Sequence, residues 1–336
     1  HCITQTSIMN TISIYLLKVL RKLYTHIFKR QQLPELQYEE NPDKISEMIY
    51  NLLSKEEPCM IARLGATELM AVVNYIGVKQ NKSNWITYIK GESLSWWWEP
   101  NVLKQMECWS GFFPPTKQNI EKFCKLIIKD TPQVDILGSW QKNEYYLSNE
   151  LKSTSKIQLM YLDPYWSKEP WSRVLANKNI LVIHPFADTI QSQYLKREYL
   201  FKNPNILPPF KTLTVIKAVQ SLGGENNGFK DWFEALEYMK GEIDKCEFDI
   251  CLIGCGAYGF PLAAHVKRIG KKAIHMGGSL QLLFGIMGNR WDHDVPHYEK
   301  GIFIHYAGLE NEYWVRPNKK ERPLAHQAVE LSLIHI

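Results

Sequence analysis

One stretch of the chain, residues 251–278, constrains the fold more than any other. It reads CLIGCGAYGFPLAAHVKRIGKKAIHMGG: an apolar run enters a turn with three glycines, an apolar helical pattern follows, and a second apolar run ends at a glycine pair. Short apolar runs without alternation are typical of strands that are buried on both faces of a parallel sheet. The stretch therefore predicts a strand, a glycine turn, a helix and a second parallel strand.

The rest of the chain repeats this alternation of apolar runs and helical patterns. We predict strands at 58–65, 134–138, 157–162, 179–186, 212–219, 248–254 and 272–276, and helices at 66–77, 119–129, 188–201 and 228–245. Such an order predicts an α/β fold, a mostly parallel Rossmann-like sheet with helices on both faces. Residues 85–115 are rich in Trp, Gly and Pro and lack a clear period, so we expect loops there. The rings of Trp96, Trp97 and Trp98 either pin these loops to the core or line a cleft.

An N-terminal amphipathic helix is predicted from residues 11–30, where apolar residues alternate with basic ones at helical spacing. The first thirty residues hold five basic residues and no acidic one, while the remaining 35 basic and 35 acidic residues balance. The balanced body argues against nucleic acid as a partner. The apolar run is too short to span a bilayer, and no cleavage site follows it. Two interpretations stay open: a helix on the membrane surface, and a helix packed on its own domain with a solvated basic face.

We divide the chain into a basic arm at 1–40, one α/β domain at 41–325 and a tail at 326–336. Residues 1–8 and 331–336 match no pattern, so we expect that they are foreign to the natural chain. The seven cysteines include no CxxC pair, which favours reduced thiols in a cytoplasmic protein. If the arm binds lipid, the protein is expected on the inner face of the membrane.

The glycine turn satisfies GxGxxG in the expected context, after a strand and at the start of a helix. Such a turn lets the backbone approach a phosphate, and the helix N-terminus favours its negative charge. A dinucleotide site also needs an acidic residue at the end of the next strand, but no Asp or Glu occurs between Asp249 and Asp292. The turn therefore favours a nucleoside diphosphate over a nicotinamide dinucleotide. Alternatively, its glycines serve only tight packing of strand and helix. The candidate binding residues of this stretch are Gly254, Gly256, Tyr258, Gly259, Gly277, Gly278 and Gln281.

Polar side chains that follow two other predicted strands are expected at the same edge of the sheet. Arg63, Thr67 and Glu68 follow the strand at 58–65, where an arginine beside a carboxylate offers a phosphate clamp and a base or metal ligand. Glu68 alone is also a common partner of a helix dipole. His184 lies near the carboxyl end of the strand predicted at 179–186 and is a candidate phosphate contact, and Asp188 is either a base or a helix N-cap. Glu144, after the strand at 134–138, is a weaker candidate of the same kind.

No HExxH, GxSxG or Walker motif is present in a suitable context, which disfavours zinc proteases, serine hydrolases and ATPases. The motif ARLGATEL at 62–69 instead resembles the RxGDGE motif of the D-type glycosyltransferase fold, a bacterial family first described as a domain of unknown function. The stretch at 252–278, and GFFP, LGSW and RW at 111–114, 137–140 and 290–291, are similar to the same family, over residues 45–320 in all.

The resemblance implies transfer of a sugar from a nucleotide diphosphate donor, assisted by a divalent metal, Mn or Mg. Arg63, Gly65 and Glu68 occupy matching positions, so the resemblance gives Gly65 a binding role and Glu68 a tentative metal-ligand role. Ala66 stands where the family has Asp and Thr67 where it has Gly, so one expected metal ligand is missing.

We therefore expect a glycosyltransferase of surface polysaccharide biosynthesis, acting on a glycan or lipid-linked acceptor. Glu68 or Asp188 would deprotonate the acceptor hydroxyl if the reaction inverts configuration. Two alternatives stay open. One is a Rossmann-type NAD(P)-dependent oxidoreductase, and the other is a non-catalytic nucleotide-binding protein at the membrane surface.

Overall fold

The computed structural model describes residues 11–28, 32–80, 84–222, 227–292, 295–296 and 303–322. The predictions about residues 1–8, 326–336 and 331–336 fall outside these ranges.

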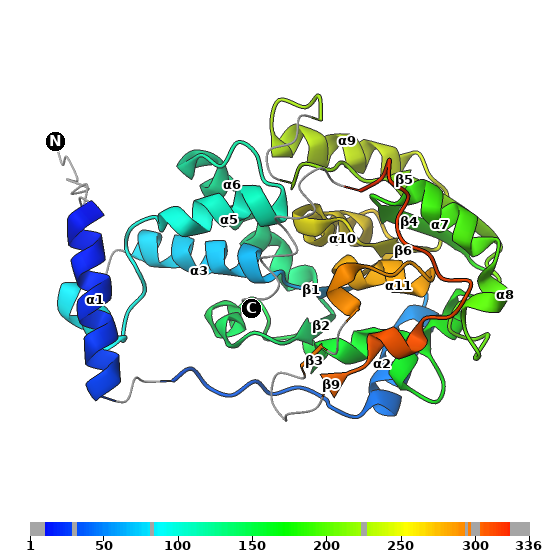
Figure 1. Ribbon diagram of the computed structural model, residues 1–336, viewed down its shortest axis with the longest axis horizontal. Helices are drawn as coiled ribbons and strands as arrows, with labels where there is room; N and C mark the ends of the chain where they lie inside the picture. The colour runs from blue at the N-terminus through cyan, green and yellow to red at the C-terminus, as the bar shows by residue number, and fades with distance from the viewer. Residues whose placement is uncertain are drawn as a thin grey trace.

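A single parallel sheet of seven strands forms the centre of the fold (Figure 1), in the order β3-β2-β1-β7-β6-β4-β5. The strands are β1 (Cys59–Arg63), β2 (Ile136–Ser139), β3 (Ser155–Gln158), β4 (Asn179–His184), β5 (Thr212–Lys217), β6 (Ile250–Ile253) and β7 (Lys272–His275). Strand β7 pairs with β6 on one side and with β1 on the other, in parallel register on both sides. The predicted α/β fold with a parallel sheet is confirmed. A two-stranded antiparallel pair, β8 (Val295–Pro296) and β9 (Phe303–Ile304), lies outside this sheet.

Helices cover both faces of the sheet because each central strand is apolar on both sides. In β6, Cys251 and Ile253 join one buried cluster, while Ile250 and Leu252 join the other. The first face carries α3 (Ala66–Gln80), α5 (Pro100–Ser110), α6 (Lys117–Asp130), α9 (Trp232–Asp244) and α10 (Gly259–Arg268). The second carries α2 (Pro42–Ser54), α7 (Ala187–Tyr194), α8 (Arg197–Leu200) and α11 (Leu280–Leu283).

The loops predicted for residues 85–115 are wrong, because this segment contains α4 (Trp85–Lys90) and α5. Asn84 caps α4 and Pro100 is the first residue of α5, and each helix ends at a glycine in the left-handed region. These signals at the helix ends indicate two helices, even though the apolar residues between them lack a clear helical period. The tryptophans pack as the first interpretation expected: Trp97 is buried, and its ring meets those of Tyr88 and Trp96 at centroid distances of 4.8 Å.

Two other predicted elements end early. Strand β3 stops at Gln158, and residues 159–162 form a 3₁₀ helix instead of continuing the strand. The helix predicted at 188–201 is divided into α7 and α8. At residues 159–162, periodicity alone did not distinguish a strand from a tight helical turn. In the divided helix, Ile190 and Leu200 are buried as an apolar face predicts, but Leu195, between α7 and α8, is 83% exposed.

The N-terminal helix α1 (Thr11–Ile27) packs against α4 at one end of the molecule (Figure 1). Lys18 Nζ lies 2.5 Å from Glu99 Oε2, and the Arg21 guanidinium lies 4.4 Å from the centroid of the Tyr88 ring. The chain then runs to the β3 edge, where the N–H of Glu39 donates to the Lys156 carbonyl at 2.9 Å. In the described part of the chain, we find no helix with the length and apolarity to cross a bilayer.

Candidate functional site

The three positions of the turn after β6 are occupied by glycine for different structural reasons. A Cβ on Gly254 would lie 2.6 Å from the Gly277 carbonyl oxygen, and one on Gly259 would lie 2.1 Å from Cε1 of His275. These two glycines allow close packing of the turn and of α10 against β7. Gly256 has φ +58°, and a Cβ there would have no neighbour nearer than 3.8 Å. The packing interpretation therefore accounts for two glycines, and open space remains at the third.

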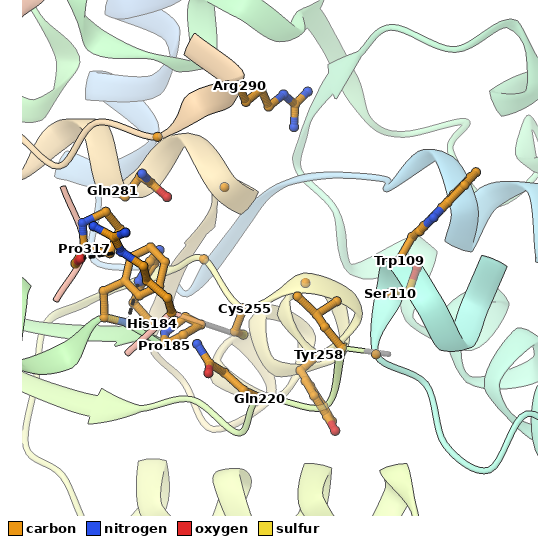
Figure 2. Close-up of a pocket in the computed structure, with 18 of the residues that line it drawn as sticks. Trp109, Ser110, His184, Pro185, Gln220, Cys255, Tyr258, Gln281, Arg290 and Pro317 are labelled. Carbon is orange, nitrogen blue, oxygen red and sulfur yellow. Dashed lines mark hydrogen bonds between the residues drawn. The ribbon is translucent and has the colours of Figure 1, made fainter. Parts of the chain in front are cut away.

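That space belongs to a pocket of about 680 Å³ at the carboxyl ends of β4, β5, β6 and β7 (Figure 2). Its floor is the turn from Gly254 to Tyr258, and Gly278 of the second glycine pair is also part of the wall. Trp109 and Ser110 at the end of α5 close another side. The N-terminus of α10 meets the pocket through this turn, and the first N–H groups of a helix favour an anion.

The charged side chains that line the pocket are basic. Arg290, Arg316 and Arg322 contribute to the wall, and within the described ranges no Asp or Glu lines it. Arg316 Nη2 lies 2.5 Å from Asp292 Oδ1 just outside, so part of its charge is balanced. A wall of this kind suits a ligand with two or more negative charges.

His184 adds a neutral hydrogen-bond donor to this wall. Its Nδ1 accepts a hydrogen bond from the Phe186 N–H at 3.0 Å, so the ring proton of the neutral imidazole is on Nε2. Burial lowers the pKa of His184 to about 3. His184 is thus placed in the pocket as predicted, but as an uncharged group that is unsuited to carry a proton near pH 7.

The strap, which we define as residues 314–322, contributes Arg316, Pro317 and Arg322 to the wall of the pocket. Glu321 holds the strap in place because its buried carboxylate caps α7. Oε1 accepts from the Asp188 N–H at 2.7 Å, and Oε2 accepts from the Thr189 N–H at 3.2 Å and from the Thr189 hydroxyl. The predicted N-cap role of Asp188 is wrong: α7 begins at Ala187, and a glutamate from a distant segment supplies the cap. The Asp188 side chain is exposed and does not line the pocket.

The second predicted group, at the end of β1, lies on the other side of the Gly277–Gly278 turn. A Cβ on Gly277 would lie 3.0 Å from Arg63 Nη1, so the Arg63 side chain packs against this turn. The Glu68 carboxylate covers Gly65, where an added Cβ would lie 1.8 Å from Oε2. Thr67 is buried. Arg63, Gly65, Thr67 and Glu68 therefore share the predicted edge of the sheet but do not line the pocket.

Two predicted binding residues line the pocket while serving the fold. The Tyr258 ring stacks on Trp232 at 4.9 Å, and its hydroxyl lies 3.2 Å from Ser221 Oγ. Gln281 Nε2 donates to the Ile286 carbonyl at 2.9 Å. Glu144, the weaker candidate, is fully buried and accepts hydrogen bonds from Ser139 Oγ and the Trp140 N–H, so it holds a loop together.

Asp163 is a buried carboxylate that sequence reasoning missed. Asp163 Oδ2 accepts a hydrogen bond from the Tyr306 hydroxyl at 2.7 Å, and Ser279, after the second glycine pair, is another partner. Burial raises the pKa of Asp163 to about 6, against the lowering effect of these hydrogen bonds and of Arg290 and Arg63. Asp163 follows a strand that ends early, so its position in the sequence did not mark it.

The arginines of the strap were also missed, because Arg316 and Arg322 lie in a segment without a period. Arg290 was noted only as part of a motif resemblance. The surplus of basic residues between 316 and 322 is the one sequence feature that could have indicated a binding role, but such runs usually lie on solvated surfaces.

The surroundings of Glu68 do not supply the ligands that a divalent metal needs. Ala66 offers no ligand, and the nearby cation is Arg63. Throughout the described segments, no three His, Cys, Asp or Glu side chains are grouped as a metal site requires. A metal stays a prediction from the resemblance, for which the described residues offer no ligand set.

The fold and the pocket define an α/β protein with a basic, glycine-lined site at the carboxyl edge of its sheet. No protein-family model and no curated protein matches the chain. Three solved structures are similar at TM-scores of 0.38 to 0.39. One is a glycosyltransferase of domain of unknown function 1792 from Streptococcus sanguinis, 11% identical, covering 87% of this chain and 97% of its own. A second, 10% identical, covers 93% of this chain and 97% of its own and is described as the same domain with a distinct glycosyltransferase fold. These descriptions name the family that the sequence motifs resemble, and likeness at this level concerns the fold alone.

Proposed function

We propose that this chain is a glycosyltransferase that binds a nucleotide diphosphate sugar in the pocket above the glycine turn. The observation that supports this most directly is the wall itself, in which three arginines, a neutral histidine donor and the α10 N-terminus surround open space. A nucleoside diphosphate has the charge and size for such a site. The acceptor is a glycan or a lipid-linked sugar of surface polysaccharide biosynthesis, and the location is cytoplasmic.

The chemistry of sugar transfer explains why cations are needed there. Breaking the bond between sugar and phosphate leaves negative charge on the diphosphate, and fixed cations and amide dipoles stabilise this charge as it develops. Arg290 and Arg322 would supply the charge, and His184 Nε2–H would donate a hydrogen bond that does not depend on pH. Glu68 is the base that we propose for the acceptor hydroxyl, on the motif resemblance and its place at the same edge of the sheet, with its carboxylate outside the wall of the donor pocket. No step is assigned to a metal.

The experiment that tests binding uses Gly278→Ala. Gly278 lines the pocket, its φ is outside the left-handed region, and the added methyl would lie 3.5 Å from the Trp291 ring, an ordinary contact. We expect about a tenfold loss of UDP-sugar affinity by calorimetry with an unchanged thermal midpoint. Gly256→Val is less informative, because φ +58° makes any side chain there strained.

The matched control is Gly241→Ala in α9, where an added Cβ has no neighbour within 4 Å. It should leave the affinity unchanged. Equal affinity of Gly278→Ala and the unmodified chain would remove the proposed pocket.

A non-catalytic nucleotide-binding protein is the second candidate, favoured by the absence of a carboxylate from the described pocket wall. Slow hydrolysis of the donor that disappears in Glu68→Gln would decide for the enzyme. Binding without turnover on a panel of donors would decide for the second candidate. The oxidoreductase alternative predicts NADH binding, which a fluorescence titration measures.

A further inference from the structure

Helix α1 turns its apolar side away from the protein. We call this side the α1 stripe: Ile12, Leu16, Val19, Leu20, Leu23 and Ile27. The residues recur at the spacing of one helix face. Ile12 is 78% exposed, Leu16 57%, Leu23 56% and Ile27 73%, so the stripe is open to solvent along the whole helix.

The opposite side of α1 holds the helix on the domain. Lys18 pairs with Glu99, Arg21 lies over the Tyr88 ring, and Leu17 and Tyr24 are half-buried. The sequence interpretation of a packed helix with a solvated basic face is therefore wrong in its orientation. Two of the basic residues contact the domain, and the apolar residues of the α1 stripe face outward.

An exposed apolar stripe of this length loses the free energy that its burial would provide, unless another surface covers it. The charge on the helix indicates which surface. Residues 11–27 contain no acidic residue. Lys18 and Arg21 contact the domain, whereas Lys22 is exposed beside the stripe and leaves a positive charge there. A second copy of α1 would bring like charges together, whereas anionic lipid headgroups would be attracted.

We propose that the α1 stripe inserts into the surface of a membrane that contains anionic lipids, with α1 lying in the plane of the interface. Helix α4, which packs against α1, adds two exposed apolar side chains, Trp85 and Ile86. Tryptophan is enriched at the level of lipid headgroups because its ring is apolar with a polar N–H. This inference does not depend on the proposed activity.

The test is flotation of the full chain with phosphatidylcholine vesicles that contain about one third phosphatidylserine, compared with pure phosphatidylcholine vesicles. We expect the chain to float with the anionic vesicles and to be released by high salt. Leu16→Gln and Leu23→Gln should each weaken the partitioning about tenfold. Both side chains are exposed, so circular dichroism and thermal midpoint should stay unchanged.

The matched control is Leu195→Gln, because Leu195 is 83% exposed and lies after α7, away from α1. It should float like the unmodified chain. The proposal is overturned if the chain does not float, if Leu195→Gln weakens flotation equally, or if sedimentation reveals a dimer that Leu16→Gln dissociates. The last result would assign the stripe to a second copy of the chain.

Discussion

Replacing Glu321 by Gln should loosen the strap and the start of α7 together. The carboxylate accepts from two backbone N–H groups, those of Asp188 and Thr189, and from the Thr189 hydroxyl. An amide keeps one acceptor oxygen and turns its NH₂ group toward a donor, so at least one buried N–H loses its partner. That loss costs about 1–3 kcal/mol, and the lost charge at the helix N-terminus adds about 0.5–1 kcal/mol. Relief of the desolvation of a buried charge offsets part of this, which leaves about 2 kcal/mol.

Hydrogen exchange measures this locally. A cost of about 2 kcal/mol corresponds to roughly thirtyfold faster exchange of the Asp188 and Thr189 amides if α7 opens by itself. UDP-sugar affinity should fall as well, because Arg316 and Arg322 flank Glu321 in the strap. Glu312→Gln is the control, since Glu312 is exposed in the adjoining segment. Unchanged exchange at both amides, or the same change in the control, would refute the capping role of Glu321.

Three further predictions concern buried groups. Gly259→Ala should destabilise the fold by about 3 kcal/mol, because the methyl would lie 2.1 Å from His275 Cε1; an unchanged urea midpoint would contradict this. The pKa of Asp163 is raised to about 6, so the folded state keeps a proton that the unfolded chain releases near pH 4. Stability should therefore fall by up to about 3 kcal/mol as pH rises from 4 to 6, and Asp163→Asn should abolish this decline in urea titrations. Burial lowers the pKa values of His184 and His275 to about 3. Only the unfolded chain gains these protons below about pH 6.5, so each histidine should lower the free energy of unfolding by about 2 kcal/mol at pH 5. This decrease is best measured in the Asp163→Asn variant, where the titration of Asp163 does not overlap with it. A flat profile would show that the rings are not buried.

The candidate site was predictable where local chemistry marks it. The glycine turn stands out because close packing and a positive φ both require glycine, and His184 stands out because it ends a fully apolar strand. Asp188 was misjudged for the opposite reason. A polar residue near a helix start is a common cap, but the sequence does not reveal a competing carboxylate from residue 321.

The position of Arg63 illustrates a second limit. Its place at the end of β1 was predicted, yet its distance from the pocket depends on strand order. Strand β1 pairs with β7 and not with β6, so the Gly277–Gly278 turn separates Arg63 from the glycine turn after β6. Strand order is a property of the whole sheet and leaves no trace in the spacing of one motif.

The sequence by itself determined the parallel α/β class, the approximate places of the strands and the glycine turn, because apolar periodicity and backbone conformation are local properties. Tertiary structure alone decided which charges meet. It brought Arg316 and Arg322 of the strap to the pocket wall, buried Asp163 against the Tyr306 hydroxyl and turned the α1 stripe outward. These outcomes depend on packing between segments far apart in the chain, where contacts and desolvation, and not local preference, set the lowest free energy.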